Sequence, residues 1–153
     1  MIEWKTVTFD QLTNHELYQL LKLRVDVFVV EQTCPYAELD NKDLLPDVTH
    51  LLGWSFGELV ACARILGPGI SYESASIGRV ATKQQYRGNG MGHQLMNVAV
   101  ETCQSIWPDH DIEISAQYHL QAYYESHGFE AISDPYLEDD IPHIHMKRAH
   151  KVD

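Results

Sequence analysis

The sequence is short of positive charge. Lysine and arginine together number 11 against 22 aspartate and glutamate residues, so the formal net charge is −11 at pH 7. Nucleic-acid binders depend on cationic side chains that displace counterions from phosphates, so this balance argues against a general nucleic-acid-binding protein. The negative overall potential favours a cationic partner instead.

Cysteine and long apolar runs are also scarce. The three cysteines, Cys34, Cys62 and Cys103, are odd in number and widely spaced, and they fit neither a disulfide framework nor a zinc pattern. No apolar run approaches the roughly 20 residues of a membrane helix, and the first ten residues, MIEWKTVTFD, lack the apolar core of a signal peptide. We therefore expect a cytoplasmic protein with no membrane partner.

The chain of 153 residues suits a single domain, residues 1–153, without repeats or a linker. Thr13 and Glu16 have the spacing of a capping box, which predicts a first helix from about Asn14 to Val30. THLLGW and LVACARIL, separated by SFGE, predict a β-hairpin, and ASIGRVAT predicts a third strand.

The second half of the chain mixes helical and strand patterns. The expected elements are, in order, an amphipathic helix ending before Pro108, a strand at IEISA, a short helix at HLQAYYESH, and closing strands at FEAIS and HIHMK. This order predicts an α+β sandwich around a mixed, mostly antiparallel sheet.

A glycine-dense loop, Arg87-Gly88-Asn89-Gly90-Met91-Gly92, opens the amphipathic helix. Glycine permits positive φ and close approach of a ligand, and a helix start offers unpaired N–H groups and the positive end of its dipole. Arg87 can grip a phosphate with its forked donors. The loop therefore predicts a phosphate site, although it has neither the Gly-Lys-Ser/Thr ending of a Walker loop nor the glycine spacing of a Rossmann fingerprint.

This loop, after an apolar strand and before an amphipathic helix, resembles the acyl-CoA signature Arg-x-x-Gly-x-Gly of the GNAT family of N-acetyltransferases. Downstream, AYYESHGF is similar to the segment that ends the family's last helix, and FVVEQTCPY and EDDIPHIHM resemble an ElaA-type subgroup. The resemblance covers most of the chain. It implies an α/β/α sandwich and an acetyl-CoA-dependent N-acetyltransferase.

Carried over to this chain, the resemblance implies roles for individual residues. Tyr124 would be the general acid near the thioester sulfur, and Gln117 stands where many members carry an asparagine that contacts the cofactor. The cofactor-binding backbone would comprise Val80, Ala81 and Thr82 along the pantetheine arm, and Arg87, Gly88, Asn89, Gly90, Met91 and Gly92 around the pyrophosphate.

The base that deprotonates the amine is left open. Some family members place a glutamate on the strand before the glycine loop, where this chain has Ser76. Glu31, His119 and His143 are the candidates, acting directly or through water. Of these, Glu31 ends the first helix, where the helix dipole disfavours a negative charge.

No metal cofactor is expected. His143 and His145 are expected on opposite faces of the closing strand, where they would not bind one ion together. Two acidic segments, Glu38 to Asp47 and Leu137 to Asp140, are expected to attract a cationic amine acceptor, either a small molecule or a protein or peptide amine. A homodimer is left open. The alternatives are a non-catalytic acyl-CoA sensor or interaction module and an enzyme that transfers a longer acyl chain.

Overall fold

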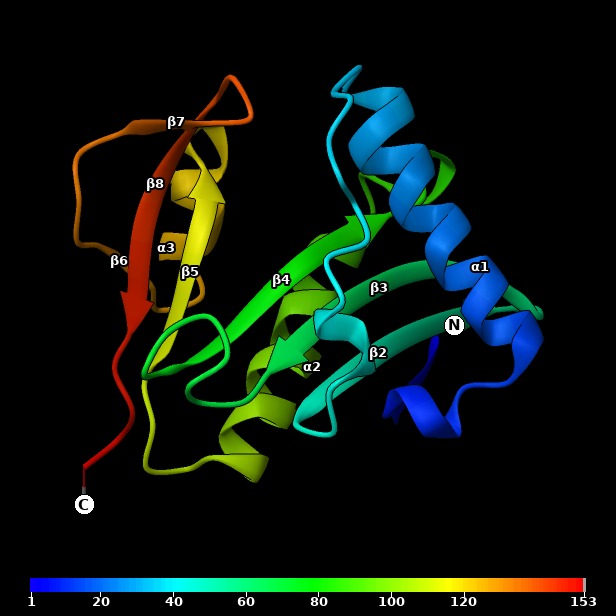
Figure 1. The fold of residues 1–153 in the computed structure, drawn as a ribbon, viewed down its shortest axis with the longest axis horizontal. Helices are drawn as coiled ribbons and strands as arrows, with labels where there is room; N and C mark the ends of the chain where they lie inside the picture. Colours follow the sequence, from blue (N-terminus) through cyan, green and yellow to red (C-terminus); the bar gives the residue numbers. More distant parts are fainter. Residues whose placement is uncertain (153) are drawn as a thin grey trace.

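The computed structural model describes residues 1–152, and it consists of one twisted sheet with helices on both faces (Figure 1). The sheet order is β1-β2-β3-β4-β5-β8-β6, with β7 paired to β8 off this path. The strands are β1 Glu3–Val7, β2 Val48–Ser55, β3 Glu58–Leu66, β4 Ala75–Thr82, β5 Ile112–Gln117, β6 Glu130–Ala131, β7 Tyr136–Glu138 and β8 Ile141–Arg148. Within residues 1–152, β4 and β5 form the one parallel pair, so the expected mixed, mostly antiparallel sheet is confirmed.

Three α-helices cover the sheet, α1 Asn14–Val25, α2 Met91–Ile106 and α3 Gln121–Glu125. The predicted capping box opens α1, because the Glu16 amide donates to Thr13 Oγ1 at 3.1 Å and the Thr13 amide donates to Glu16 Oε1 at 2.9 Å. A π-helical turn, Asp26–Glu31, continues α1 to one residue beyond the predicted end at Val30. Such turns are rare and often lie at functional sites.

Two hydrophobic cores lie between the helices and the sheet, one on each face. On one face, Leu20 and Leu23 of α1 pack on Leu52, Leu59 and Cys62 of the sheet. The other face carries the larger core, where Leu95, Met96 and Ala99 of α2 meet inward side chains of the strands. Figure 1 shows α1 in front of the sheet and α2 behind it. The predicted sandwich is therefore confirmed.

Several elements differ from the expectation. Strand β1 was not predicted, and it becomes an edge strand only by pairing with β2 in the register Glu3↔Trp54 to Val7↔His50. Strand β7 was not predicted either, and β6 is shorter than the expected strand at FEAIS. Among residues 1–152, no helix combines the length and apolar character that crossing a membrane requires.

The sheet splits between β4 and β5. These parallel strands pair only through Ala75↔Ile112 and Ser76↔Glu113, and beyond these positions they diverge, as Figure 1 shows. The β3–β4 register shifts between Cys62↔Ala81 and Arg64↔Gly78, so β4 carries an extra residue there, and Arg79 has a positive φ of 50°. A bulge of this kind kinks the strand and leaves backbone groups without ladder partners.

Candidate active site

A cavity of about 680 Å³ occupies the split between β4 and β5. One wall is β4, from Ser76 to Thr82, and the opposite wall is Ser115 and Gln117 of β5 with His143 of β8. The π-helical turn, the start of α2 and the turn between β7 and β8 complete the lining. The split therefore gathers segments that lie far apart in the sequence around one space.

The glycine loop forms an open cradle beside this cavity. Gly88 and Gly90 have positive φ values of 93° and 76°, and among the described residues nothing lies within 4 Å of a Cβ built on either. Gly90 is the N-cap of α2 and, within residues 1–152, provides no side-chain cap. The first N–H groups of α2 are left for a ligand, which is the arrangement that binds phosphate groups.

The free edge of β4 continues from this cradle. Ala81 and Thr82 pair with Cys62 and Ala61 of β3 on one side, and no described strand pairs with them on the other. Val80 lies at the bulge, where the ladder is interrupted. An extended ligand can therefore add to this edge through main-chain hydrogen bonds.

Arg87 is held between two acceptors at the mouth of the cavity. Its guanidinium donates to both carboxylate oxygens of Glu31, at 2.7 and 3.1 Å, and to the Thr82 carbonyl at 2.8 Å. The pair is partly exposed, with 37% of the Arg87 side chain and 35% of the Glu31 side chain accessible to solvent. Glu31, a predicted site residue, is therefore ion-paired with Arg87 of the glycine loop.

Two adjacent tyrosines in α3 differ in what their hydroxyls contact. Tyr123 donates to the Gly92 carbonyl at 2.5 Å and ties α3 to the first turn of α2. Tyr124 is buried against Phe129 and lines the cavity, and within residues 1–152 its hydroxyl makes no hydrogen bond. Burial raises the pKa of Tyr124 to about 12, so the phenol carries its proton at neutral pH.

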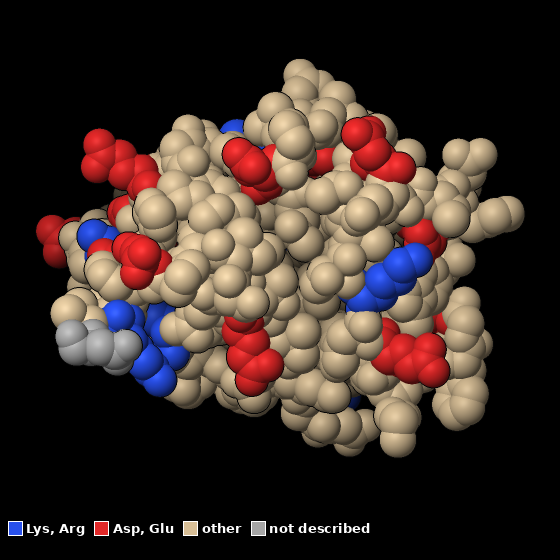
Figure 2. All heavy atoms as spheres, turned by 90° about the horizontal axis from the view of Figure 1, so that it is seen from below, with Lys and Arg blue, Asp and Glu red and all other residues tan. Residues whose placement is uncertain are grey.

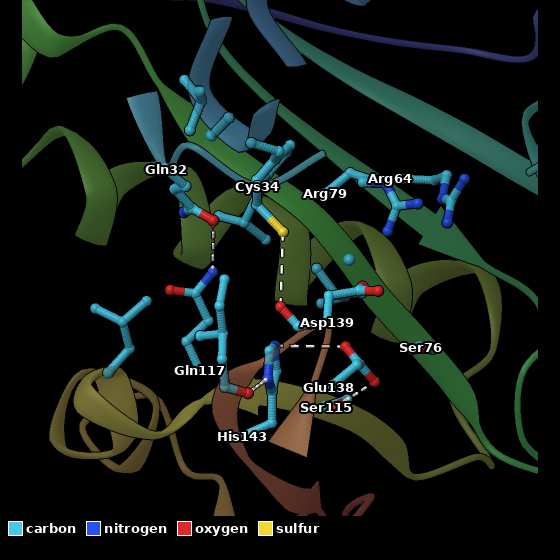
Figure 3. Close-up of a pocket in the computed structure, with 18 of the residues that line it drawn as sticks. Gln32, Cys34, Arg64, Ser76, Arg79, Ser115, Gln117, Glu138, Asp139 and His143 are labelled. Atoms are coloured by element: carbon cyan, nitrogen blue, oxygen red, sulfur yellow. Dashed lines mark hydrogen bonds and ion pairs between the residues drawn. The ribbon is translucent and has the colours of Figure 1, made fainter. Parts of the chain in front are cut away.

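The remaining predicted residues lie on different parts of the cavity. Gln117 reaches across the split, where its side-chain amide donates to Gln32 Oε1 at 3.1 Å (Figure 3). His119 lies in the short 3₁₀ turn Tyr118–Leu120, exposed at the rim. Met91 points into the core, so only its backbone is available to a ligand.

The acidic segment from Glu38 to Asp47 is largely neutralised by arginines. Arg24 of α1 donates to Glu38 at 2.5 Å and to Asp43 at 2.8 Å, and all three side chains are almost fully buried. Arg64 of β3 grips Asp40 through two bonds of 2.8 Å, and Arg79 pairs with Glu38 at 2.7 Å. The expectation that this segment attracts a cation is not supported by its position, because its buried carboxylates already have cationic partners.

These ion pairs also decide which carboxylates stay ionised. Burial alone raises the pKa of Asp40, but the hydrogen bonds and charge of Arg64 outweigh it and lower that pKa to about 2. The pKa of Asp43 is lowered in the same way, by Arg24 and Arg64 against burial. Asp40 lines the cavity, but so weak a base is a poor proton acceptor at neutral pH.

The second acidic segment remains open to the cavity. Glu138 and Asp139, at the end of β7 and in the turn to β8, both line it. Figure 2 shows acidic side chains spread over the surface in view, with lysine and arginine in a few small groups. Of the two predicted acidic segments, Leu137 to Asp140 is the one whose cavity-lining carboxylates have no arginine or lysine partner among the described residues.

His143 and His145 lie on the same face of β8, so the expectation of opposite faces is wrong. Residues two apart in a strand project to the same side, and the register places His143 opposite Gln117 and His145 opposite Ser115. Their rings bond different groups: His145 contacts Glu113 at 2.9 Å, whereas His143 contacts the Ile141 carbonyl at 2.7 Å. Among the described residues, no cluster of three or more metal-ligating side chains is present.

The cavity thus gathers most of the predicted site residues. Its lining includes Glu31, Val80, Ala81, Thr82, Arg87, Gly92, Gln117, His119 and Tyr124. Gly88, Asn89 and Gly90 are exposed on the rim. Arg64, Arg79 and Ser115 also line it and were not predicted. The signal for Arg79 was present, since an arginine after Gly78 interrupts an otherwise uncharged strand.

Comparison with known proteins agrees with this geometry. A family model described as an acetyltransferase (GNAT) domain matches residues 25–150. The protein ElaA of Escherichia coli K12 is 48% identical over 148 residues, which cover 97% of each chain. A crystal structure of an acyl-CoA N-acyltransferase from Pseudomonas aeruginosa superimposes with a TM-score of 0.93 at 48% identity, covering 97% of this chain and 100% of that one.

The crystal structure of E. coli ElaA superimposes equally well, with a TM-score of 0.92 at 47% identity, covering 97% of this chain and 99% of that one. The split sheet, the glycine cradle and the buried tyrosine therefore occur in a chain that matches the family in both sequence and structure. The chain belongs to the GNAT family and has the fold of an acyltransferase.

Proposed function

We propose that the protein is an acetyl-CoA-dependent N-acetyltransferase, which transfers the acetyl group to a primary amine by direct attack in a ternary complex. The observation that carries the proposal is the meeting of three features in one cavity: the glycine cradle, the free edge of β4 and the unbonded Tyr124 hydroxyl. The family description supports acyl transfer from a CoA thioester. The three free cysteines are in keeping with a reducing, cytoplasmic setting.

The residues present fit coenzyme A. The cradle from Arg87 to Gly92 would hold the pyrophosphate through N–H groups, because the space above Gly88 and Gly90 is open. The edge of β4 from Val80 to Thr82 would pair with the pantetheine amides as an added strand does. Gln117 would contact the arm after exchanging its bond with Gln32.

Three things are required for the chemistry: a neutral amine, a polarised carbonyl and a proton for the departing thiolate. Backbone N–H groups at the β4 bulge would polarise the carbonyl, because positioned donors stabilise the charge that develops on oxygen. The carbon–nitrogen bond forms as the carbon–sulfur bond breaks, and Tyr124 would donate its hydroxyl proton to the thiolate. The attacking nitrogen returns a proton to the tyrosinate, so the side chain ends as it began.

The proposal is tested by following release of free CoA with a thiol-reactive dye. Acetyl-CoA and two longer acyl thioesters are each offered with a panel of primary amines, and binding of CoA is measured separately by calorimetry. We expect turnover with at least one amine and the highest kcat/KM with acetyl-CoA. Binding without turnover on any amine would instead support the alternative, an acyl-CoA sensor or interaction module.

Arg87→Ala is expected to raise the Kd for CoA about 10-fold. A charge-assisted hydrogen bond is worth about 1.5–3 kcal/mol, and part of that gain is offset because Arg87 must give up Glu31. Calorimetric titration with CoA measures the effect. The matched control is Lys83→Ala, because Lys83 pairs with Glu58 and does not line the cavity. Equal losses in both variants would contradict a phosphate contact by Arg87.

The acceptor is proposed to be cationic, with Asp139 among the groups that attract it. Asp139→Asn is expected to lower kcat/KM for a diamine up to about fivefold at low salt, since an exposed charge pair is worth up to ~1 kcal/mol. The loss should shrink as salt is added, because screening weakens such pairs. Asp134→Asn is the control, since Asp134 lies outside the cavity lining. A salt-independent loss, or an equal loss with a neutral alkoxyamine, would contradict the idea.

A further inference from the structure

We infer that His143 is the general base that removes the proton from the acceptor amine, and that Glu138 stabilises its protonated ring; this inference rests on the proposed function. His143 is 7% exposed, on the central strand of the β5–β8–β7 half of the sheet, and its side chain lines the cavity. It is therefore a buried titratable group with access to the space where the acceptor must enter.

The hydrogen bond to Ile141 determines which ring nitrogen can act as the base. His143 Nδ1 lies 2.7 Å from the Ile141 carbonyl oxygen, which can only accept, so Nδ1 carries the proton in the neutral ring. The lone pair is then on Nε2. This nitrogen faces Glu138 Oε2 at 3.4 Å, too far for a strong hydrogen bond but close enough to stabilise a positive ring (Figure 3).

Glu138 is itself held in place. Its Oε1 accepts from Ser115 Oγ at 3.3 Å, and Ser115 Oγ lies 2.5 Å from the Tyr136 hydroxyl. The Tyr136 ring stacks on His143 with 6.3 Å between centroids and 25° between planes. Ser115 of β5 therefore holds the carboxylate, and the Ile141 carbonyl on Nδ1 orients the imidazole.

The other groups around His143 do not compete for this role. The strands beside it contribute Gln117 and Ser115 from β5, and Tyr136 and Glu138 from β7. The acidic and imidazole groups near it are Glu138 at the end of β7, Asp139 in the turn to β8 and His119 at the rim. Glu31, the remaining candidate, is paired with Arg87, and His119 has no orienting partner among the described residues.

The step is a single proton transfer. The N–H bond of the substrate ammonium breaks, an Nε2–H bond forms on His143, and the electron pair stays on the amine nitrogen, which can then attack the thioester carbonyl. The imidazolium is stabilised by the Glu138 carboxylate and returns its proton to water. With a base on β8, the reaction does not need an acidic side chain at Ser76, where some family members have a glutamate.

The test compares two acceptors of the same skeleton, an alkylamine, which is protonated at neutral pH, and an alkoxyamine, which is not. His143→Asn keeps a donor for the Ile141 carbonyl but has no atom at the Nε2 position. We expect it to lower kcat/KM for the alkylamine at least about 100-fold, and for the alkoxyamine less than fivefold. The alkylamine deficit should shrink as the pH rises and neutral amine becomes abundant.

Glu138→Gln supplies the second measurement. Because it removes the charge that stabilises the protonated ring, it is expected to lower kcat/KM for the alkylamine about 5- to 10-fold and to spare the alkoxyamine. Equal losses with both acceptors in His143→Asn, or no loss with either, would overturn the inference while the wild type still turns over. Absence of turnover by the wild type with both acceptors would instead defeat the proposed function. Calorimetry with CoA shows that each variant is folded.

Discussion

Tyr124→Phe is expected to lower kcat by about 10²- to 10⁴-fold, the range typical of a lost general acid. The substitution removes one oxygen that, among the described residues, makes no hydrogen bond, and it leaves the ring packed on Phe129. We therefore expect the melting temperature to stay the same and the Kd for CoA to change less than about twofold. Steady-state kinetics with saturating amine and calorimetry with CoA measure the two effects.

Tyr123→Phe is the matched control, because the neighbouring hydroxyl has a structural partner. It loses the 2.5 Å bond to the Gly92 carbonyl, which should cost about 1 kcal/mol of unfolding free energy. Its kcat should change far less than that of Tyr124→Phe. A Tyr124→Phe enzyme with kcat within threefold of wild type would remove the tyrosine from the mechanism and leave it as packing beneath the thioester.

The features predicted correctly are those that lie within one short stretch of chain. The capping box of Thr13 and Glu16, the hairpin around SFGE and the glycine loop each depend on residues a few positions apart. The π-helical turn was not predicted because its residues carry the same periodic apolar pattern as the helix before it. Strand β1 was missed because three of its five residues are exposed and it exists only through pairing with β2.

The charge distribution of the site was not predictable because it depends on contacts between residues that are far apart in the sequence. The segment from Glu38 to Asp47 looks like a solvated acidic run, but its partners stand far away in sequence. Arg24 meets Glu38 across 14 residues, and Arg64 meets Asp40 across 24. Only the packing of α1 on the folded sheet brings these two arginines beside the loop. The acidic segment around Glu138, by contrast, was recognised from the sequence. The proximity of Glu138 to His143 was not predicted.

Arg24→Met is expected to lower the free energy of unfolding by about 3–5 kcal/mol, the usual cost of breaking a buried ion pair by removing one partner. Arg24 is 1% exposed and holds Glu38 at 2.5 Å and Asp43 at 2.8 Å. Methionine fills much of the space, but it leaves carboxylates buried with fewer cations. Urea denaturation followed by circular dichroism measures the change.

Lys22→Met on the same helix is the matched control. Lys22 pairs with Asp26 at 2.6 Å with both side chains exposed, so its removal should cost only about 0.3–0.5 kcal/mol. The double variant Arg24→Met/Glu38→Gln should recover part of the loss, because it removes one uncompensated charge from the interior. If Arg24→Met were no more destabilising than Lys22→Met, the arginines would not be what holds the loop from Glu38 to Asp47 against the cavity. This part of the cavity wall would then depend on packing alone.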